Sequence, residues 1–141
     1  MDRYGHKINQ AARKFAKKTN EQLSCLGLYS SQWAIIFCLH NRGPLTQIEI
    51  GCYLNVEAPT ITRTVARLEE LGYVVREAGE DKRERKVFLT PKAAEMIPLW
   101  QKEVDRLEAV VVQDIEEHDL AVFQRVLQQM MKNLDSLQRT E

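Results

Sequence analysis

The segment from residue 46 to residue 90 constrains the fold most, because two short helical patterns there are followed by two short β-rich runs. Thr46 with Glu49 three residues later is a capping box, which predicts that a helix starts in TQIEIGCYLN. Pro59 predicts the first turn of a second helix, where its missing N–H costs least, and Gly72 predicts that helix's end. YVVRE and RKVFL, on either side of AGEDKRE, then predict a hairpin with a polar tip.

Two further helical patterns precede this segment. The first runs up to Ser24 and has one stripe of side chains at helical spacing: Ile8, Ala12, Phe15, Thr19 and Leu23. Gly27 breaks the pattern, and a cap at Ser30 or Ser31 predicts the start of a second helix that ends after His40, at NRGP. Because this second helix is apolar nearly all round, we expect it in the core.

Two long helical patterns follow the hairpin. Thr90 as N-cap and Pro91 at the first position predict a helix start, and Pro98 predicts a bend inside that helix. The final helix carries apolar side chains at heptad spacing: Leu120, Phe123, Leu127, Met130, Leu134 and Leu137. A monomer would leave this seam partly exposed, together with Ile8 and Phe15 of the first helix. We therefore expect a homodimer formed through the two termini.

Three helices followed by a hairpin is the order of a winged helix-turn-helix. The expected fold class is mainly α with a small β-hairpin wing: a winged helix-turn-helix flanked by long N- and C-terminal dimerisation helices. The length of 141 residues predicts a single domain, 1–141. Within it, residues 28–90 form the predicted DNA-binding region, and residues 1–27 and 91–141 form the predicted helical dimerisation region.

The charges cancel over the whole chain but not along it. Residues 1–24 carry six basic and two acidic groups, whereas residues 91–141 carry six basic and ten acidic groups. Two such regions suit each other as neighbours, and they suit solvent equally well. No apolar run approaches the about 20 residues that span a bilayer, so we expect no membrane partner. Cys25, Cys38 and Cys52 form no CxxC pair, which favours a reducing cytoplasm.

The helix predicted over residues 58–72 has the side chains that a recognition helix needs. Its inner face is aliphatic, and its outer face and flanks carry hydroxyl and guanidinium groups in the first half. Arginine can bridge a guanine edge in the major groove, and threonine can hydrogen-bond bases or phosphates. The candidate DNA-binding residues on this helix are Thr60, Thr62, Arg63 and Arg67. Glu69 and Glu70 would repel phosphates, so only the first half is expected to enter the groove. An ordinary amphipathic surface helix has the same pattern.

The predicted hairpin adds a basic cluster of Lys82, Arg83, Arg85 and Lys86. A basic hairpin beside a recognition helix can place an arginine in the adjacent minor groove, where the potential is most negative. Asp81 is expected to pair with Arg83 and hold it in one rotamer. A solvated turn of mixed charge is the alternative.

The stretch LTQIEIGCYLNVEAPTITRTVARLEELGYVVREAGEDKRERKVFLTPKA resembles the MarR family of regulators. The resemblance is carried by LTQIEI, by the Thr62-Arg63 step followed by RLEELGYV, and by Asp81-Lys82-Arg83 leading into LTPKA. The preceding LYSSQWAIIFCL is similar to the family's second helix. The likeness covers residues 28–93, and the flanking helices match by pattern only.

The resemblance implies a homodimer whose first and last helices interleave, with two winged domains on adjacent major grooves. Thr62 and Arg63 match positions that meet bases or nearby phosphates, Arg83 matches a minor-groove wing arginine, and Asp81 matches its partner. Gly51 stands where alanine is usual, and Ala93 where glycine is usual. The implied function is a regulator, expected to be a repressor, on a palindromic operator in duplex DNA.

Three alternatives stay open for control and partner. A small aromatic ligand in a cleft lined by Trp33, Phe37 and Trp100 is one hypothesis for release from DNA, with packing of these rings in the core as the other reading. A redox-responsive regulator that uses Cys25 is the second. A helical dimer that binds protein instead of DNA is the third.

We expect no enzyme, no cofactor and no metal. GxSxG, HExxH and a phosphate-binding glycine loop are absent from the sequence. Glu21, Cys25 and His40 are weak candidates for zinc, because the helix after the hairpin has no histidine pair at i,i+4 spacing.

Overall fold

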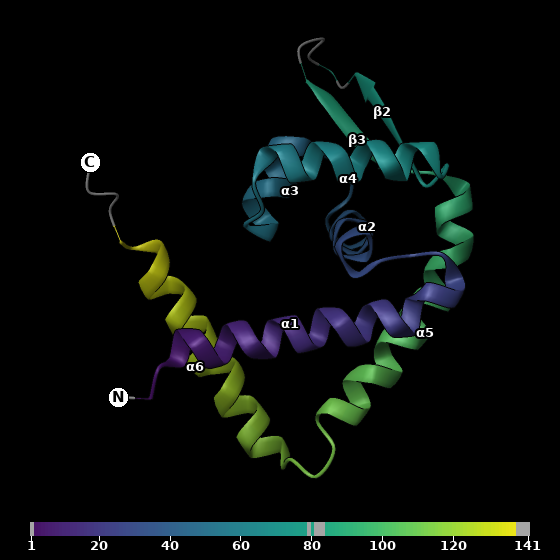
Figure 1. Cartoon of the computed structure of the whole chain (residues 1–141). Helices are drawn as coiled ribbons and strands as arrows, with labels where there is room; N and C mark the ends of the chain where they lie inside the picture. Colours follow the sequence, from purple (N-terminus) through teal and green to yellow (C-terminus); the bar gives the residue numbers. More distant parts are fainter. Residues whose placement is uncertain (1, 79, 81–83, 138–141) are drawn as a thin grey trace. The chain divides into compact units, whose positions relative to one another are not determined.

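The computed structural model describes residues 2–78, 80 and 84–137 (Figure 1). The contacts within the chain form two compact units, Met1–Leu107 and Glu108–Glu141. The first contains α1 Tyr4–Leu23, η1 Ser24–Leu26, α2 Ser30–Arg42, β1 Leu45–Thr46, α3 Gln47–Leu54, α4 Ala58–Glu70, β2 Val74–Ala78, β3 Arg85–Leu89 and most of α5 Pro91–Val111. The second contains the end of α5 and α6 Glu117–Asp135. The expected fold class is confirmed, although the unit boundary falls inside α5.

A three-stranded antiparallel sheet forms the wing, in the order β1-β3-β2. β2 and β3 are the predicted hairpin, with Val74 opposite Leu89 and Arg76 opposite Val87. β1 was not predicted: it is two residues long, with Leu45 opposite Val87 and Thr46 opposite Lys86. Two residues are too few for an alternating pattern, so only the pairing with β3 defines this strand.

Local signals placed three helix starts correctly and one wrongly. Pro59 lies in the first turn of α4, as predicted. Thr46 and Glu49 form the predicted capping box, with N–H to side-chain oxygen distances of 3.1 and 3.2 Å. Thr90 Oγ1 accepts the N–H of Ala93 at 3.3 Å, and Pro91 is the first residue of α5. The expected cap at Ser30 or Ser31 is wrong, because Tyr29 is the N-cap of α2.

The start of α2 depends on one side chain from within the helix and one from α1. Gln32 Oε1 accepts the N–H of Tyr29 at 2.9 Å, and Asn20 Oδ1 on α1 accepts the N–H of Ser30 at 2.7 Å. Because these carboxamides satisfy the first N–H groups of α2, neither serine hydroxyl is needed as a cap.

The core of the first unit is built around α2, as expected from its sequence. Six of its side chains are buried: Gln32, Trp33, Ile35, Ile36, Cys38 and Leu39. Trp100 of α5 is fully buried, and its ring packs edge-on against Tyr73 at 4.8 Å and Trp33 at 6.4 Å between centroids. Its indole N–H donates to the carbonyl of Leu26 at 3.3 Å. The aromatic cluster thus joins the start of α5 to the segments before α2 and after α4.

The junction between α4 and α5 is held by polar contacts across a tight turn. Gly72 has φ +82°, the left-handed conformation expected of a residue just past a helix end. Its carbonyl accepts the Thr90 hydroxyl at 2.6 Å. Lys92 Nζ donates to the carbonyl of Leu71 at 2.7 Å and lies 4.8 Å from the centroid of the Tyr73 ring. These contacts satisfy the carbonyl end of α4.

In the second unit, none of the described side chains of α6 is buried. Phe123, Leu134 and Leu137 of the predicted seam are exposed, and Leu120, Leu127 and Met130 are half-buried. On α1, in the first unit, Ile8 and Phe15 are exposed as well. Apolar side chains are therefore left uncovered in both units, as the dimer hypothesis requires.

No single helix in the described part of the chain is long and apolar enough to cross a membrane. Only Tyr4–Leu26 and Ser30–Arg42 taken together reach that length and apolarity, and the break between them bends by 83°. The apolar side chains Trp33, Ile35, Ile36, Cys38 and Leu39 of α2 are buried in the core described above.

Replacing Trp100 by phenylalanine is expected to lower the free energy of unfolding by about 1–3 kcal/mol. The smaller ring leaves a gap in the core, and the carbonyl of Leu26 loses its donor. Chemical denaturation of parent and variant at one protein concentration measures the change. The control Tyr29→Phe alters a 62% exposed ring and should stay within about 0.5 kcal/mol of the parent. Equal stability of the Trp100 variant would contradict its structural role.

Candidate nucleic-acid interface

The burial of its inner face sets which side chains α4 turns outward. Ile61, Val65 and Leu68 are at most 2% exposed, so the helix cannot rotate about its axis without uncovering them. Of the predicted DNA-binding residues on this helix, Thr62, Arg63 and Arg67 are exposed and Thr60 is half-buried. The four side chains lie on the outer face and its two flanks, as the helical spacing predicts.

The predicted contact residues of α4 differ in how strongly the protein already engages them. Arg63 Nη2 lies 3.4 Å from Thr60 Oγ1, a long contact between exposed groups. Arg67 forms a 3.0 Å ion pair with Glu70, one turn further along. The guanidinium of Arg63 is therefore the more available of the two for a ligand in front of α4.

The wing brings two of its predicted basic residues to the start of β3. Arg85 is exposed and lies opposite Ala78 in the sheet, while Lys86 is half-buried and lies opposite Glu77. Asp81, Lys82 and Arg83 lie outside the described residues. The Asp81–Arg83 ion pair and the minor-groove role of Arg83 thus stay predictions.

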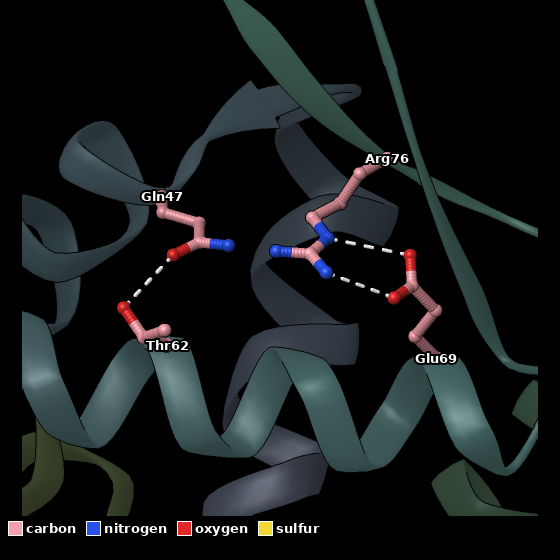
Figure 2. A network of polar contacts seen from close by, with 4 residues as sticks. All are labelled: Gln47, Thr62, Glu69 and Arg76. Carbon is pink, nitrogen blue, oxygen red and sulfur yellow. Dashed lines mark hydrogen bonds and ion pairs between the residues drawn. The ribbon is translucent and has the colours of Figure 1, made fainter.

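An ion pair between α4 and the wing was missed by the sequence reasoning (Figure 2). Arg76 of β2 donates from Nε and Nη2 to the two carboxylate oxygens of Glu69, at 3.3 and 2.9 Å. The hydrogen bond from Arg76 holds the pKa of Glu69 below its usual value, and the carboxylate raises the pKa of Arg76. The pair therefore persists at neutral pH and is lost only as the pH falls through the folded-state pKa of Glu69.

This ion pair changes the interpretation of the acidic end of α4. Glu69 was expected to repel phosphates, and Glu70 with it, but both carboxylates are paired with arginines of the same chain. The signal in the sequence is the Gly72 turn, which reverses the chain and brings residues seven apart side by side. Bidentate arginine–carboxylate contacts fix orientation as well as distance. The contact between Arg76 and Glu69 therefore fixes the position of β2 relative to α4.

Gln47, also missed, connects α3 with α4. It is the first residue of α3, and its side-chain oxygen accepts the hydroxyl of Thr62 at 3.0 Å (Figure 2). The same hydroxyl lies 3.0 Å from the carbonyl of Ala58, one turn back on α4. Figure 2 shows the nitrogen end of the Gln47 amide turned toward the guanidinium of Arg76.

Two grooves adjoin Gln47 on the surface of the first unit. One groove lies between α3 and α4 and is lined by Gln47, Ile48, Gly51, Cys52, Asn55, Val56, Ala58 and Thr62. The other lies between the start of α3 and the wing and is lined by Thr46, Gln47, Ile48, Glu49, Arg76, Glu84 and Arg85. Ile48 borders both grooves and is 78% exposed, which is unusual for an isoleucine on a folded domain.

The side chains of the hypothesised ligand cleft form one aromatic cluster. Trp33 and Trp100 are buried, whereas Phe37 is 40% exposed and its ring lies 5.6 Å from that of Trp33. Two of the three rings therefore pack in the core, in agreement with the packing reading. A cleft that opens beside them stays a prediction.

The cysteines lie in different surroundings. Cys25 and Cys52 are exposed, and Cys38 is buried. Burial raises the pKa of the Cys38 thiol, which the positive charge of Arg42 only partly opposes. No group of three or more His, Cys, Asp and Glu side chains within residues 2–78, 80 and 84–137 is placed to hold a metal ion.

Comparison with known proteins connects this geometry to transcriptional regulators. The model of the MarR family matches residues 28–84. The HTH-type transcriptional regulator YwoH of Bacillus subtilis is 47% identical over 127 residues, which cover 90% of this chain and 93% of YwoH. The structure of the transcriptional regulator PA3341 is 32% identical, with a TM-score of 0.87 and coverage of 95% of this chain and 99% of that one.

A structure of reduced AbfR bound to DNA shares the fold, with a TM-score of 0.73, 23% identity and coverage of 93% of this chain and 91% of AbfR. The family model and the relatives agree with the winged helix-turn-helix seen here, and both YwoH and PA3341 are described as transcriptional regulators. This chain belongs to the MarR family of helix-turn-helix transcriptional regulators, not to a family of enzymes.

Proposed function

We propose that this regulator acts as a homodimer that binds a palindromic operator in duplex DNA and represses transcription there. The observation that carries the proposal is the outer face of α4, where Arg63 and Thr62 are exposed on a helix whose inner face is buried. A rigid helix whose second turn carries an exposed guanidinium, held only by a long contact to Thr60, has the geometry for bidentate contact with guanine in the major groove. The AbfR complex supports this reading, since a protein of the same fold was solved on DNA.

The charges around α4 support one mode of approach to DNA. Because Glu69 and Glu70 are paired with Arg76 and Arg67, the second half of the helix presents little uncompensated negative charge. Arg63 is then the principal base-reading side chain on α4, and Arg67 contributes less. Arg85 and Lys86 of β3 extend the basic surface toward the wing tip, where Arg83 would enter the minor groove.

Dimerisation is proposed through residues 1–27 and 91–141. The uncovered apolar side chains of α1 and α6 support it, since exposed patches of this kind mark interfaces. Two recognition helices related by a two-fold axis would then reach half-sites about 34–36 Å apart, which is one turn of DNA. The basic N-terminal and acidic C-terminal regions provide charges that favour their association.

Release from DNA by a small aromatic ligand is part of the same proposal. Phe37 is the exposed member of the aromatic cluster, so a ligand that binds there would contact α2 and the buried Trp33. Pro98 lies inside α5, where a proline removes one backbone hydrogen bond of the helix. Ligand binding beside α2 and bending of α5 are proposed to change the spacing of the two recognition helices.

The chain is expected to sediment as a stable dimer in analytical ultracentrifugation at micromolar concentration. Leu127→Glu, on the seam of α6, should raise the dimer dissociation constant at least about tenfold, since it would bury a charge. Gln128→Glu adds the same charge at an exposed position off the seam and should leave the dimer intact. A folded monomer of the parent at this concentration would contradict the dimer proposal.

Arg63→Ala is expected to weaken binding to the operator by about 1–3 kcal/mol, and binding to random duplex much less, because a base contact is lost. Fluorescence anisotropy measures both affinities, with an operator first selected from random duplex by the parent dimer. Arg67→Ala should have the smaller effect, since Glu70 already engages that guanidinium.

Circular dichroism of each variant checks that the fold is intact. If the parent selects no operator and its affinity for duplex DNA does not fall with salt, the chain is a protein-interaction module. If both variants bind the selected operator like the parent, the assigned face of α4 is wrong.

A further inference from the structure

The hydroxyl proton of Thr62 is already used inside the protein. A threonine hydroxyl can donate one hydrogen bond and accept two. Two acceptors lie within reach of Thr62 Oγ1, the side-chain oxygen of Gln47 and the carbonyl of Ala58, each at 3.0 Å. Both acceptors belong to the same chain, so a ligand in front of α4 would have to break one of these contacts to receive the proton.

This conclusion holds for either orientation of the Gln47 amide. In the orientation of Figure 2, the amide oxygen faces Thr62 and the amide nitrogen faces Arg76. If the amide turns over, its nitrogen donates to Thr62 Oγ1, and the hydroxyl proton goes to the carbonyl of Ala58. In both cases the proton stays within the protein.

Gln47 is well placed to hold Thr62 in this state. Its backbone follows the capping box of Thr46 and Glu49, which fixes the start of α3. On its far side lies the guanidinium of Arg76, itself held by two contacts to Glu69 (Figure 2). Since the amide nitrogen and the guanidinium are both donors, Arg76 forms no hydrogen bond with the amide in this orientation, and the position of Gln47 is set by the start of α3 and by its contact with Thr62.

With its proton engaged, Thr62 keeps two groups for a ligand, the lone pairs of its oxygen and its methyl group, and of these only the methyl group suits thymine, whose major-groove edge has no donor. The side chain is exposed and borders the groove between α3 and α4, where its neighbour Ile48 is 78% exposed. A methyl group beside an exposed isoleucine is an apolar surface. In the major groove, the apolar group on a base edge is the C5-methyl of thymine.

We infer that Thr62 selects thymine in each half-site by methyl contact rather than by donating a hydrogen bond, and that Gln47 is the positioning residue that keeps its proton engaged. This inference rests on the proposed function, because it assumes that α4 enters the major groove of an operator. Within that function it assigns a base preference to a residue that was expected to hydrogen-bond bases or phosphates. It also makes Gln47, which lies on α3, a determinant of sequence specificity.

The experiment replaces the thymines of the selected operator one at a time with deoxyuridine, which lacks only the C5-methyl. At one thymine position in each half-site, the replacement should lower the affinity of the full-length parent dimer about fourfold. This is the change in affinity expected when one methyl group is no longer buried. Thr62→Val keeps methyl groups without the hydroxyl, and should bind with the same preference for thymine over deoxyuridine. Thr62→Ser keeps the hydroxyl without the methyl, and should bind both operators equally.

Gln47→Met tests the positioning role, since it keeps the length of the side chain without its hydrogen bonds. The preference for thymine should fall, while affinity for random duplex stays as in the parent. The matched control is Thr64→Val, which removes a hydroxyl bonded to the carbonyl of Thr60 at 2.8 Å on the other flank of α4. This variant should prefer thymine over deoxyuridine as the parent does. That result would show that the loss of preference is specific to the contacts of Thr62 and does not follow from removing any threonine hydroxyl on α4.

The outcomes distinguish this inference from the function on which it rests. If the parent selects no operator, the proposed function fails. If an operator is selected but no thymine responds to deoxyuridine, or Thr62→Ser keeps the preference and Thr62→Val loses it, the methyl contact is overturned and the regulator function stands. A Gln47→Met variant that discriminates like the parent overturns the role of Gln47 alone.

Discussion

Burial of the inner face of α4 is the interaction on which the functional surface depends. Ile61, Val65 and Leu68 recur at helical spacing and are almost fully removed from water, which fixes the rotation of the helix about its axis. A turn of 100° would expose these side chains and direct a different set outward. The identity of the outward residues, and with it every inference about DNA, follows from this constraint.

The rotation of α4 does not determine which of its charged side chains are available to a ligand. The polar contacts between elements determine this. Arg76 neutralises Glu69 and joins the wing to the helix, while Gln47 joins α3 to Thr62. The elements that would meet DNA are thus connected by side chains before any ligand arrives. Such preorganisation reduces the entropy lost on binding.

The ends of the chain follow a different principle. The winged domain has a core of its own, centred on α2 and the Trp100 cluster, whereas α6 buries none of its described side chains. An amphipathic helix gains most of its stability by packing its apolar face, so α6 of an isolated chain lacks that source of stability. This is the physical reason why assembly and folding of the C-terminal unit are expected to be linked.

Sequence alone determined what local physics controls. The capping box at Thr46, the prolines at helix starts, the glycine after α4 and the apolar periods of the helices predicted the order of the helices and the hairpin, and the starts of α3, α4 and α5. Each of these signals acts within a few residues, where chain connectivity guarantees that the partners meet. The outward set on α4 was predictable for the same reason, since the helical period relates it to the buried face.

Tertiary structure decided which polar groups pair across elements. At the start of α2, the N–H of Ser30 is satisfied by Asn20 of α1, a contact that the local sequence around the serines does not indicate. β1 exists only through its pairing with β3. From the sequence, Glu69 was expected to repel phosphates, but in the fold it pairs with Arg76. Gln47 had no predicted role, but in the fold its amide accepts the hydroxyl of Thr62. A charged or carboxamide side chain is compatible with many partners, and only the fold selects the one that lies within hydrogen-bond distance.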